Sequence, residues 1–140
     1  MIHHATSDLF ARYPDSDARA AVATHRVADV TVAGTVTDRP SFFVGHKTHA
    51  LHETFDIITP GGMALRIVDN VSLAPAIGVH PGDAVVVAGQ LIPTSGEPIV
   101  HDTHHCPGPG WHRGGWIEWH GVRYQGLWRG PHRMPGSGGQ

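Results

Sequence analysis

The stretch PGDAVVVAGQL, residues 81–91, decides the fold class that this chain is expected to adopt. Its Pro-Gly-Asp start is a turn signal, and the valine-rich run behind it has the composition of a buried strand. Because successive side chains of a strand point to opposite faces, Val85, Val87 and Leu91 are predicted to lie on one side. A turn that leads into such a strand is typical of the fourth strand of an OB-fold, a five-stranded Greek-key barrel.

Four further segments supply the other strands of this barrel. The first, VADVTVAGTVT (27–37), carries alternating valines and a glycine, Gly34, at which the strand can bend. ALHETFDIIT (50–59) and MALRIVD (63–69) follow as the second and third strands, and EPIVHDTHH (97–105) is the fifth. The residues predicted to point inward from the first three strands are Val30, Val32, Val36, Phe55, Ile57, Leu65 and Ile67.

The sequence therefore predicts a mainly β protein, a five-stranded OB-fold-like barrel with a short N-terminal helix and a C-terminal β-hairpin. Residues 1–26 form an N-terminal helical segment, with helix expected over 7–25 and an interruption at Pro14. Residues 27–125 form the barrel, which includes the hairpin of WIEW and VRYQ. Residues 126–140 are rich in Gly, Pro and Arg and are predicted to be a flexible tail.

Composition limits the classes of function. The 140 residues suit one domain, and the formal net charge of −2 does not favour a general nucleic-acid binder at neutral pH. The 13 histidines outnumber the 10 lysines and arginines, so full protonation in mild acid would raise the formal charge to about +11. One cysteine excludes an internal disulfide. Without a membrane span or a signal peptide in this sequence, we expect a soluble, cytoplasmic protein and no membrane partner.

Ligand-type side chains are concentrated in HDTHHCPGPGWHRGGW, residues 101–116. Imidazole with a carboxylate or a thiolate suits a divalent ion such as Zn, Mn, Fe or Ni. The candidate metal ligands are His101, Asp102, His104, His105, Cys106 and His112. The spacing matches neither a zinc finger nor a metalloprotease helix, so a metal-free acid–base site and a polar loop that binds nothing both remain alternatives.

On the predicted fifth strand, the histidines of this cluster would point to two opposite faces. Alternation would place Asp102 and His104 on one face, and His101, Thr103 and His105 on the other, unless the strand ends and the chain turns. His52, on the second strand, is predicted to converge on this region. The candidate catalytic residues are His52, His104, His105 and His112.

Aromatic and arginine side chains alternate in the last part of the chain, as in OB-folds that hold a nucleic-acid strand by base stacking. The candidate substrate-binding residues are Trp111, Arg113, Trp119, Arg123 and Tyr124. The alternative is that the C-terminal hairpin caps the barrel and buries Trp116 and Tyr124. Among the acidic residues no convincing pair is found. Asp69 and Asp83 are assigned to turns, and only Asp102 and, more weakly, Glu53 and Glu118 are assigned to the site.

Four blocks of the sequence resemble a family of small OB-type bacterial proteins that is known as a domain of unknown function. They are GTV (34–36), HETF (52–55), VSLAPAIGVHPGDAVVVAGQL (71–91) and IVHDTHHCPGPGWHRGGWIEWHGVRYQ (99–125). The resemblance covers about residues 30–125 and rests mainly on the last block. It supports the barrel fold and points to the histidines but implies no activity, and many relatives resemble secreted proteins.

The positions that match the family pattern are His52, His101, Thr103, His104, His105, Pro107, His112, Gly115, Trp116, Ile117, Gly121 and Tyr124. Two positions depart from it. Asp102 stands where the family has Trp, and Cys106 stands where the family has Asp. If the family's Asp is a ligand or a base, either Cys106 or Asp102 must take its role here.

Three functions are compatible with these patterns. The first is a hydrolase that uses the histidine cluster, with a metal or by acid–base catalysis, on phosphodiesters or nucleic acid at the barrel groove. The second is a binding module for single-stranded nucleic acid or a nucleotide. The third is a metal-stapled structural or self-assembling protein. The oligomeric state is left open.

Overall fold

The computed structural model describes residues 2–47, 49–72, 76–104 and 114–124. Its elements, in chain order, are α1 (Ile2–Arg12), α2 (Ser16–Ala23), β1 (Ala28–Val36), β2 (Ser41–Val44), β3 (Leu51–Ile58), β4 (Ala64–Asn70), β5 (Ala84–Ile92), β6 (Ile99–His101), β7 (Trp116–Trp119) and β8 (Val122–Tyr124). The predicted flexible tail, 126–140, lies outside the described residues.

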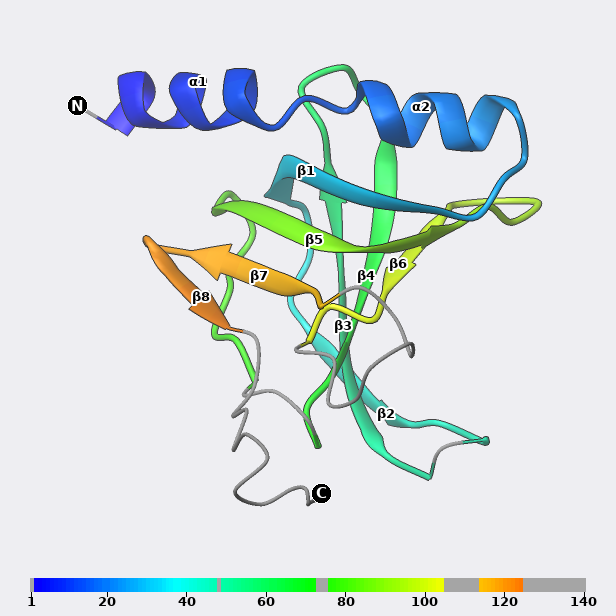
Figure 1. Ribbon diagram of the computed structural model, residues 1–140. Helices are drawn as coiled ribbons and strands as arrows, with labels where there is room; N and C mark the ends of the chain where they lie inside the picture. The colour runs from blue at the N-terminus through cyan, green and yellow to red at the C-terminus, as the bar shows by residue number, and fades with distance from the viewer. Residues whose placement is uncertain (1, 48, 73–75, 105–113, 125–140) are drawn as a thin grey trace.

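Five strands close into a barrel in the order β1-β3-β4-β6-β5, with β5 paired back to β1 (Figure 1). All the pairs are antiparallel except β4–β6, which is parallel. This strand order is that of an OB-fold-like barrel, so the predicted fold class is confirmed. The fifth strand is shorter than predicted, because β6 covers only Ile99–His101.

Alternating side chains build the barrel core as the sequence predicts. The inward residues of β1, β3, β4 and β5 have at most 2% of their surface exposed. These residues are Val30, Val32, Val36, Phe55, Ile57, Leu65, Ile67, Val85, Val87 and Leu91. Burial of this apolar surface is the main contribution to the stability of the barrel.

Gly34 allows β1 to change partners. The strand pairs with β5 through Thr35 and then with β3 through Thr35 and Val36. A Cβ atom at Gly34 would lie 2.9 Å from Ile58 O and from Ile57 Cδ1. The predicted bend at Gly34 is therefore the point at which β1 crosses close to β3.

The N-terminal segment contains two helices, and the first begins at Ile2, before the helical region expected over residues 7–25. Pro14 separates them as predicted, because α1 ends at Arg12 and α2 begins at Ser16. Both helices lie beside β1 (Figure 1), and α2 buries Ala18 and Ala21 against the barrel core.

Two hairpins extend the barrel. β2 pairs only with β3, and both its phenylalanines are exposed. β7 pairs with β5 and with β8, which confirms the predicted C-terminal hairpin. Its turn is His120-Gly121, and both residues have positive φ, 53° and 76°, as a two-residue type I′ turn requires.

No helix in the described part of the chain is long and apolar enough to cross a membrane.

Candidate functional site

Two acidic residues lie opposite each other inside one end of the barrel. Glu53 of β3 is the cross-strand partner of Asp69 of β4. Each follows the inward alternation of its strand, two residues from Phe55 and from Ile67, and each is 0% exposed. Two carboxyl groups therefore occupy inward-facing positions of β3 and β4, at which the other residues of these strands are apolar.

Hydrogen bonds satisfy one oxygen of each carboxyl group. Glu53 Oε1 accepts a hydrogen bond of 2.9 Å from the backbone N–H of Ile77, and the hydroxyl of Thr103 lies 3.4 Å from Asp69 Oδ1. Glu53 Oε2 and Asp69 Oδ2 have no hydrogen-bond partner among the described residues. An unsatisfied buried polar group costs about 1–3 kcal/mol, so this arrangement opposes stability.

The surroundings favour the protonated forms. Burial and, to a lesser extent, the charge of Glu53 raise the pKa of Asp69 to about 8, against the opposing effect of the hydrogen bond from Thr103. Burial also raises the pKa of Glu53, against the hydrogen bond from Ile77. The pair therefore retains protons in a pH range where ordinary carboxyl groups are ionised.

Residues 102–104 close the barrel beside this pair. Over residues 101–104 the predicted alternation does not hold, because β6 ends at His101 and the chain turns at Asp102, which has a left-handed φ of 54°. Thr103 and His104 are consequently both buried, at 0% and 4% exposure, instead of facing opposite sides. The Thr103 hydroxyl also lies 3.2 Å from Val68 O, beyond the part of β4 that β6 covers.

Two glycines leave room for this segment. A Cβ atom at Gly89 of β5 would lie 2.5 Å from His101 O and 2.9 Å from Thr103 Cγ2. A Cβ atom at Gly115 would collide with the Asp102 carbonyl oxygen, and the Gly115 N–H donates to His104 O at 2.7 Å. Residues 102–104 thus pass between β5 and the start of β7 only because both positions lack a side chain.

The predicted metal ligands are only partly within the described residues. His101 Nε2 lies 3.0 Å from Gln90 Oε1 and 3.6 Å from Asp102 Oδ2. Among residues 2–47, 49–72, 76–104 and 114–124, no group of three or more His, Cys, Asp or Glu lies close enough to hold a metal ion. His105, Cys106 and His112 lie outside the described residues, so the metal site stays a prediction.

His52 is on the other face of β3 from the acid pair. Its ring stacks on Phe43 with centroids 5.1 Å apart, and its Nδ1 lies 3.0 Å from Ala50 O. The alternation that turns Glu53 into the barrel turns His52 outward. Glu53, not His52, is therefore the residue of β3 that lies inside this end of the barrel.

An open pocket of about 470 Å³ lies next to Glu53. One wall comes from the chain between β1 and β2 and from β2 itself, with Arg39 and Phe42, and the other comes from residues 76–80, with Ile77 and His80. Its volume is in the range of small-molecule sites. The buried acid pair therefore has one member, Glu53, in the wall of a pocket.

The C-terminal aromatic residues pack on the protein. Trp119 Nε1 donates a 3.0 Å hydrogen bond to Asp83 Oδ2, and Trp119 and Tyr124 pack against the core cluster. The Arg123 guanidinium lies 3.8 Å from the ring centroid of Trp116 and pairs with Glu118. This agrees with the capping part of the alternative, but Trp116 and Tyr124 are only partly buried, and Trp116 does not belong to the core cluster. Trp111 and Arg113 lie outside the described residues.

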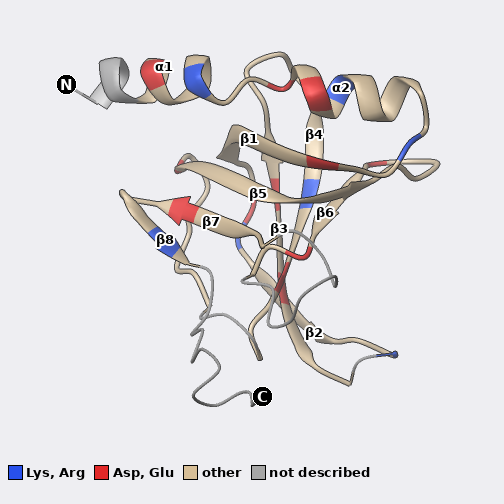
Figure 2. Cartoon of the chain, in the orientation of Figure 1, with Lys and Arg blue, Asp and Glu red and all other residues tan. Residues whose placement is uncertain are grey.

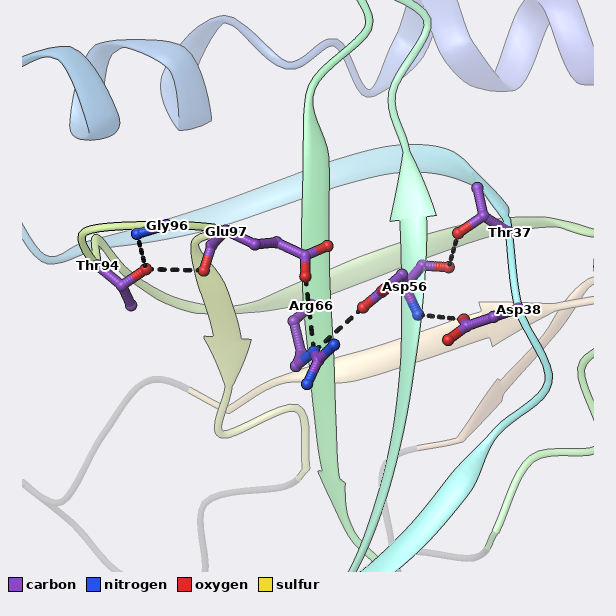
Figure 3. Close-up of polar contacts among 7 residues, drawn as sticks. All are labelled: Thr37, Asp38, Asp56, Arg66, Thr94, Gly96 and Glu97. Atoms are coloured by element: carbon purple, nitrogen blue, oxygen red, sulfur yellow. Dashed lines mark hydrogen bonds and ion pairs between the residues drawn. The ribbon is translucent and has the colours of Figure 1, made fainter.

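The outer face of β3 and β4, where OB-folds commonly bind oligonucleotides, is acidic here. Arg66 pairs with Asp56 at 3.2 Å and with Glu97 at 3.6 Å, and Asp38 accepts a hydrogen bond from the Asp56 N–H (Figure 3). Figure 2 shows acidic and basic positions scattered over the described elements, with no continuous run of Lys and Arg on any strand. This charge pattern does not favour a polyanion on that face.

Asp69 is the site residue that the sequence interpretation missed, and its assignment to a turn is wrong. It lies in β4 and is buried. The available signal was the alternation of inward positions. Leu65, Ile67 and Asp69 in β4 are the cross-strand partners of Ile57, Phe55 and Glu53 in the antiparallel strand β3. Asp83, in contrast, does follow the predicted turn, where its Oδ2 accepts a hydrogen bond from the His80 N–H.

Comparison with protein-family models, curated proteins and solved structures gave no match. The family resemblance described above therefore stays a prediction.

Proposed function

We propose that this chain is a hydrolase of small esters or phosphoesters that transfers protons through the buried pair Glu53–Asp69. The observation that supports this proposal is the position of two fully buried carboxyl groups on neighbouring strands, one of them in the wall of a pocket. Carboxyl groups with raised pKa values beside a cavity are typical of acid–base catalysis.

In this proposal Glu53 is the catalytic residue, because it is the member of the pair that lies against the pocket. Asp69 is a positioning residue that acts through Glu53. Two neighbouring carboxyl groups resist simultaneous ionisation, so Asp69 keeps a proton available to Glu53 near neutral pH. Thr103 and Ile77 orient the two carboxyl groups through their other oxygens.

A small substrate fits this site better than a nucleic acid does. The pocket has a limited volume, and the outer face of β3 and β4 carries Asp38, Asp56 and Glu97 around Arg66. The phosphodiesterase and single-strand binding functions predicted from the sequence are therefore tested with a short oligonucleotide beside small esters. The metal-dependent form of the reaction also needs His105, Cys106 or His112, which lie outside the described residues, and is tested separately.

The experiment is a hydrolysis screen with 4-nitrophenyl acetate, bis(4-nitrophenyl) phosphate and a single-stranded oligonucleotide. We expect turnover of at least one small ester and a loss of about 10²- to 10⁴-fold in kcat for Glu53→Gln. Asp69→Asn should shift the pH profile of kcat instead of abolishing turnover. The control is Asp17→Asn, because Asp17 is an exposed acid in the first turn of α2 and belongs to no candidate site. Turnover that is unchanged in Glu53→Gln would disprove the assignment.

A further inference from the structure

The pocket beside Glu53 has a chemical character that indicates its ligand. Its lining includes Glu53, the apolar residues Ile77 and Val79, and Phe42, which is the cross-strand partner of Glu53 on β2. Ile77 and Val79 are 2% and 3% exposed, so they form a fixed apolar surface, whereas Phe42 is 54% exposed. A flat apolar body can pack on the exposed ring of Phe42 beside this surface.

At the buried end, Glu53 offers one unused oxygen. Oε1 is held by the Ile77 N–H, while Oε2 is buried and has no hydrogen-bond partner among the described residues. A ligand hydroxyl can donate to an ionised carboxyl group and accept from a protonated one. It would therefore satisfy Oε2 in either protonation state of the acid pair.

At the open end, Arg39 is an exposed cation whose charge is not balanced within the described part of the chain. The neighbouring Asp38 is already used, because its Oδ1 accepts a 2.7 Å hydrogen bond from the Asp56 N–H. His80, also in the pocket wall, lies 3.8 Å from Asp83 Oδ2, so its charge has a partner when it is protonated. Arg39 is thus the group that is left to attract an anion.

We infer that the pocket binds a small, flat, apolar acid that carries a hydroxyl or ester oxygen at one end and an anionic group at the other. The oxygen contacts Glu53, the apolar body packs on Phe42 beside Ile77, and the anion faces Arg39. The inference rests on the proposed function in so far as this molecule is the substrate or product class of Glu53. Its binding, however, is measurable without turnover.

Three probes separate the contacts, with affinities measured by isothermal titration calorimetry. The reference probe, 4-hydroxyphenylacetate, has the hydroxyl, the ring and the carboxylate. Phenylacetate lacks the hydroxyl, and 2-(4-hydroxyphenyl)ethanol lacks the carboxylate. We expect each of the two incomplete probes to bind about tenfold more weakly, which is the usual loss for one hydrogen bond or ion pair at a binding site.

Variants then assign each contact to a residue. Arg39→Ala should weaken binding of 4-hydroxyphenylacetate about tenfold and leave 2-(4-hydroxyphenyl)ethanol unchanged. Arg26→Ala, at an exposed position between α2 and β1, is the matched control for lost charge. Phe42→Ala should weaken all three probes, whereas Phe43→Ala, which removes the ring stacked on His52 on the other face of β2, should weaken none.

Glu53→Leu should remove the preference for the hydroxyl, so that 4-hydroxyphenylacetate and phenylacetate bind equally. If this variant does not fold, the Arg39 and Phe42 comparisons still decide the inference. Equal affinities of all three probes for the wild type, or no binding, would overturn it. Binding without ester hydrolysis would overturn only the proposed hydrolase, and hydrolysis without probe binding would overturn only the ligand class.

Discussion

Glu53 and Asp69 face each other across the antiparallel pair β3–β4, and neither side chain has exposed surface. Because the pKa of Asp69 rises from 3.8 to about 8 on folding, the folded chain holds a proton between these pH values that the unfolded chain has lost. The free energy of unfolding should then fall as pH rises through this window, by up to about 1.4 kcal/mol per pH unit. The raised pKa of Glu53 acts in the same direction.

We expect Asp69→Asn to flatten this pH dependence, because an amide does not titrate. The measurement is urea denaturation at several pH values between about 5 and about 8, from which the free energy of unfolding is obtained. Asp17→Asn is the matched control, since Asp17 is an exposed acid in the first turn of α2. Equal slopes in the wild type and Asp69→Asn would contradict the assigned proton.

Alanine at Gly89 or Gly115 should destabilise the protein. Each new methyl group would collide with backbone atoms of residues 101–103, and overpacking of this kind costs about 1–3 kcal/mol. Gly96→Ala is the control, because a Cβ atom there meets nothing within 4 Å. Thermal unfolding of the three variants measures the difference. A Gly89→Ala protein as stable as Gly96→Ala would show that residues 102–104 can move aside.

Replacing Trp119 by Phe tests whether this tryptophan supports the fold. The change removes the donor to Asp83, and we expect a loss of about 1–3 kcal/mol because a charged acceptor loses its hydrogen bond. Val122→Ala, on the paired strand at a 53% exposed position, should change stability much less. The same variants are titrated with a single-stranded oligonucleotide. A loss of oligonucleotide affinity without a loss of stability in Trp119→Phe would favour the base-stacking role predicted from the sequence.

The histidine cluster is tested by elemental analysis of protein purified without a metal column. The sequence predicts about one Zn, Mn, Fe or Ni per chain, lost in His104→Ala and in His105→Ala. His25→Asn is the control, because His25 is exposed and has a left-handed φ of 51°, which Asn tolerates. A chain without metal after soaking and dialysis would disprove the metal-dependent hydrolase. Metal whose chelation lowers the melting temperature, in a chain without turnover, would favour the metal-stapled structural protein.

The barrel could be predicted from local patterns because its inward residues alternate without interruption. The alternation that placed Phe55 and Ile67 inside the barrel reaches Glu53 and Asp69 two residues further on. The acid pair was nevertheless not predicted, because Asp at the end of a strand was interpreted as a turn former. Burial pattern, not residue type, was the better guide at these two positions.

The path of residues 102–104 could not be predicted from the same patterns. It depends on the left-handed conformation of Asp102 and on the absence of side chains at Gly89 and Gly115, which lie far from one another in the sequence. Strand alternation predicts only which face each residue of one strand occupies. It does not predict close contacts between backbone segments that are far apart in the sequence. The N-terminal helical region starts earlier than expected for a simpler reason, since α1 begins at Ile2 without a capping signal.

The strand order also sets the sequence of events in folding. The contacts of the β3–β4 hairpin are local in sequence, because a short turn joins the two strands and the Thr59 N–H donates to Met63 O within it. The β1–β5 pair is not local, because β2, β3 and β4 lie between these two strands in the chain. Local contacts form faster than distant ones. We therefore expect Glu53 and Asp69 to meet early in folding, while both are hydrated, and to lose their hydration when residues 102–104 pack beside them. We expect this burial step to take up a proton, so the refolding rate should fall as the solution becomes more alkaline.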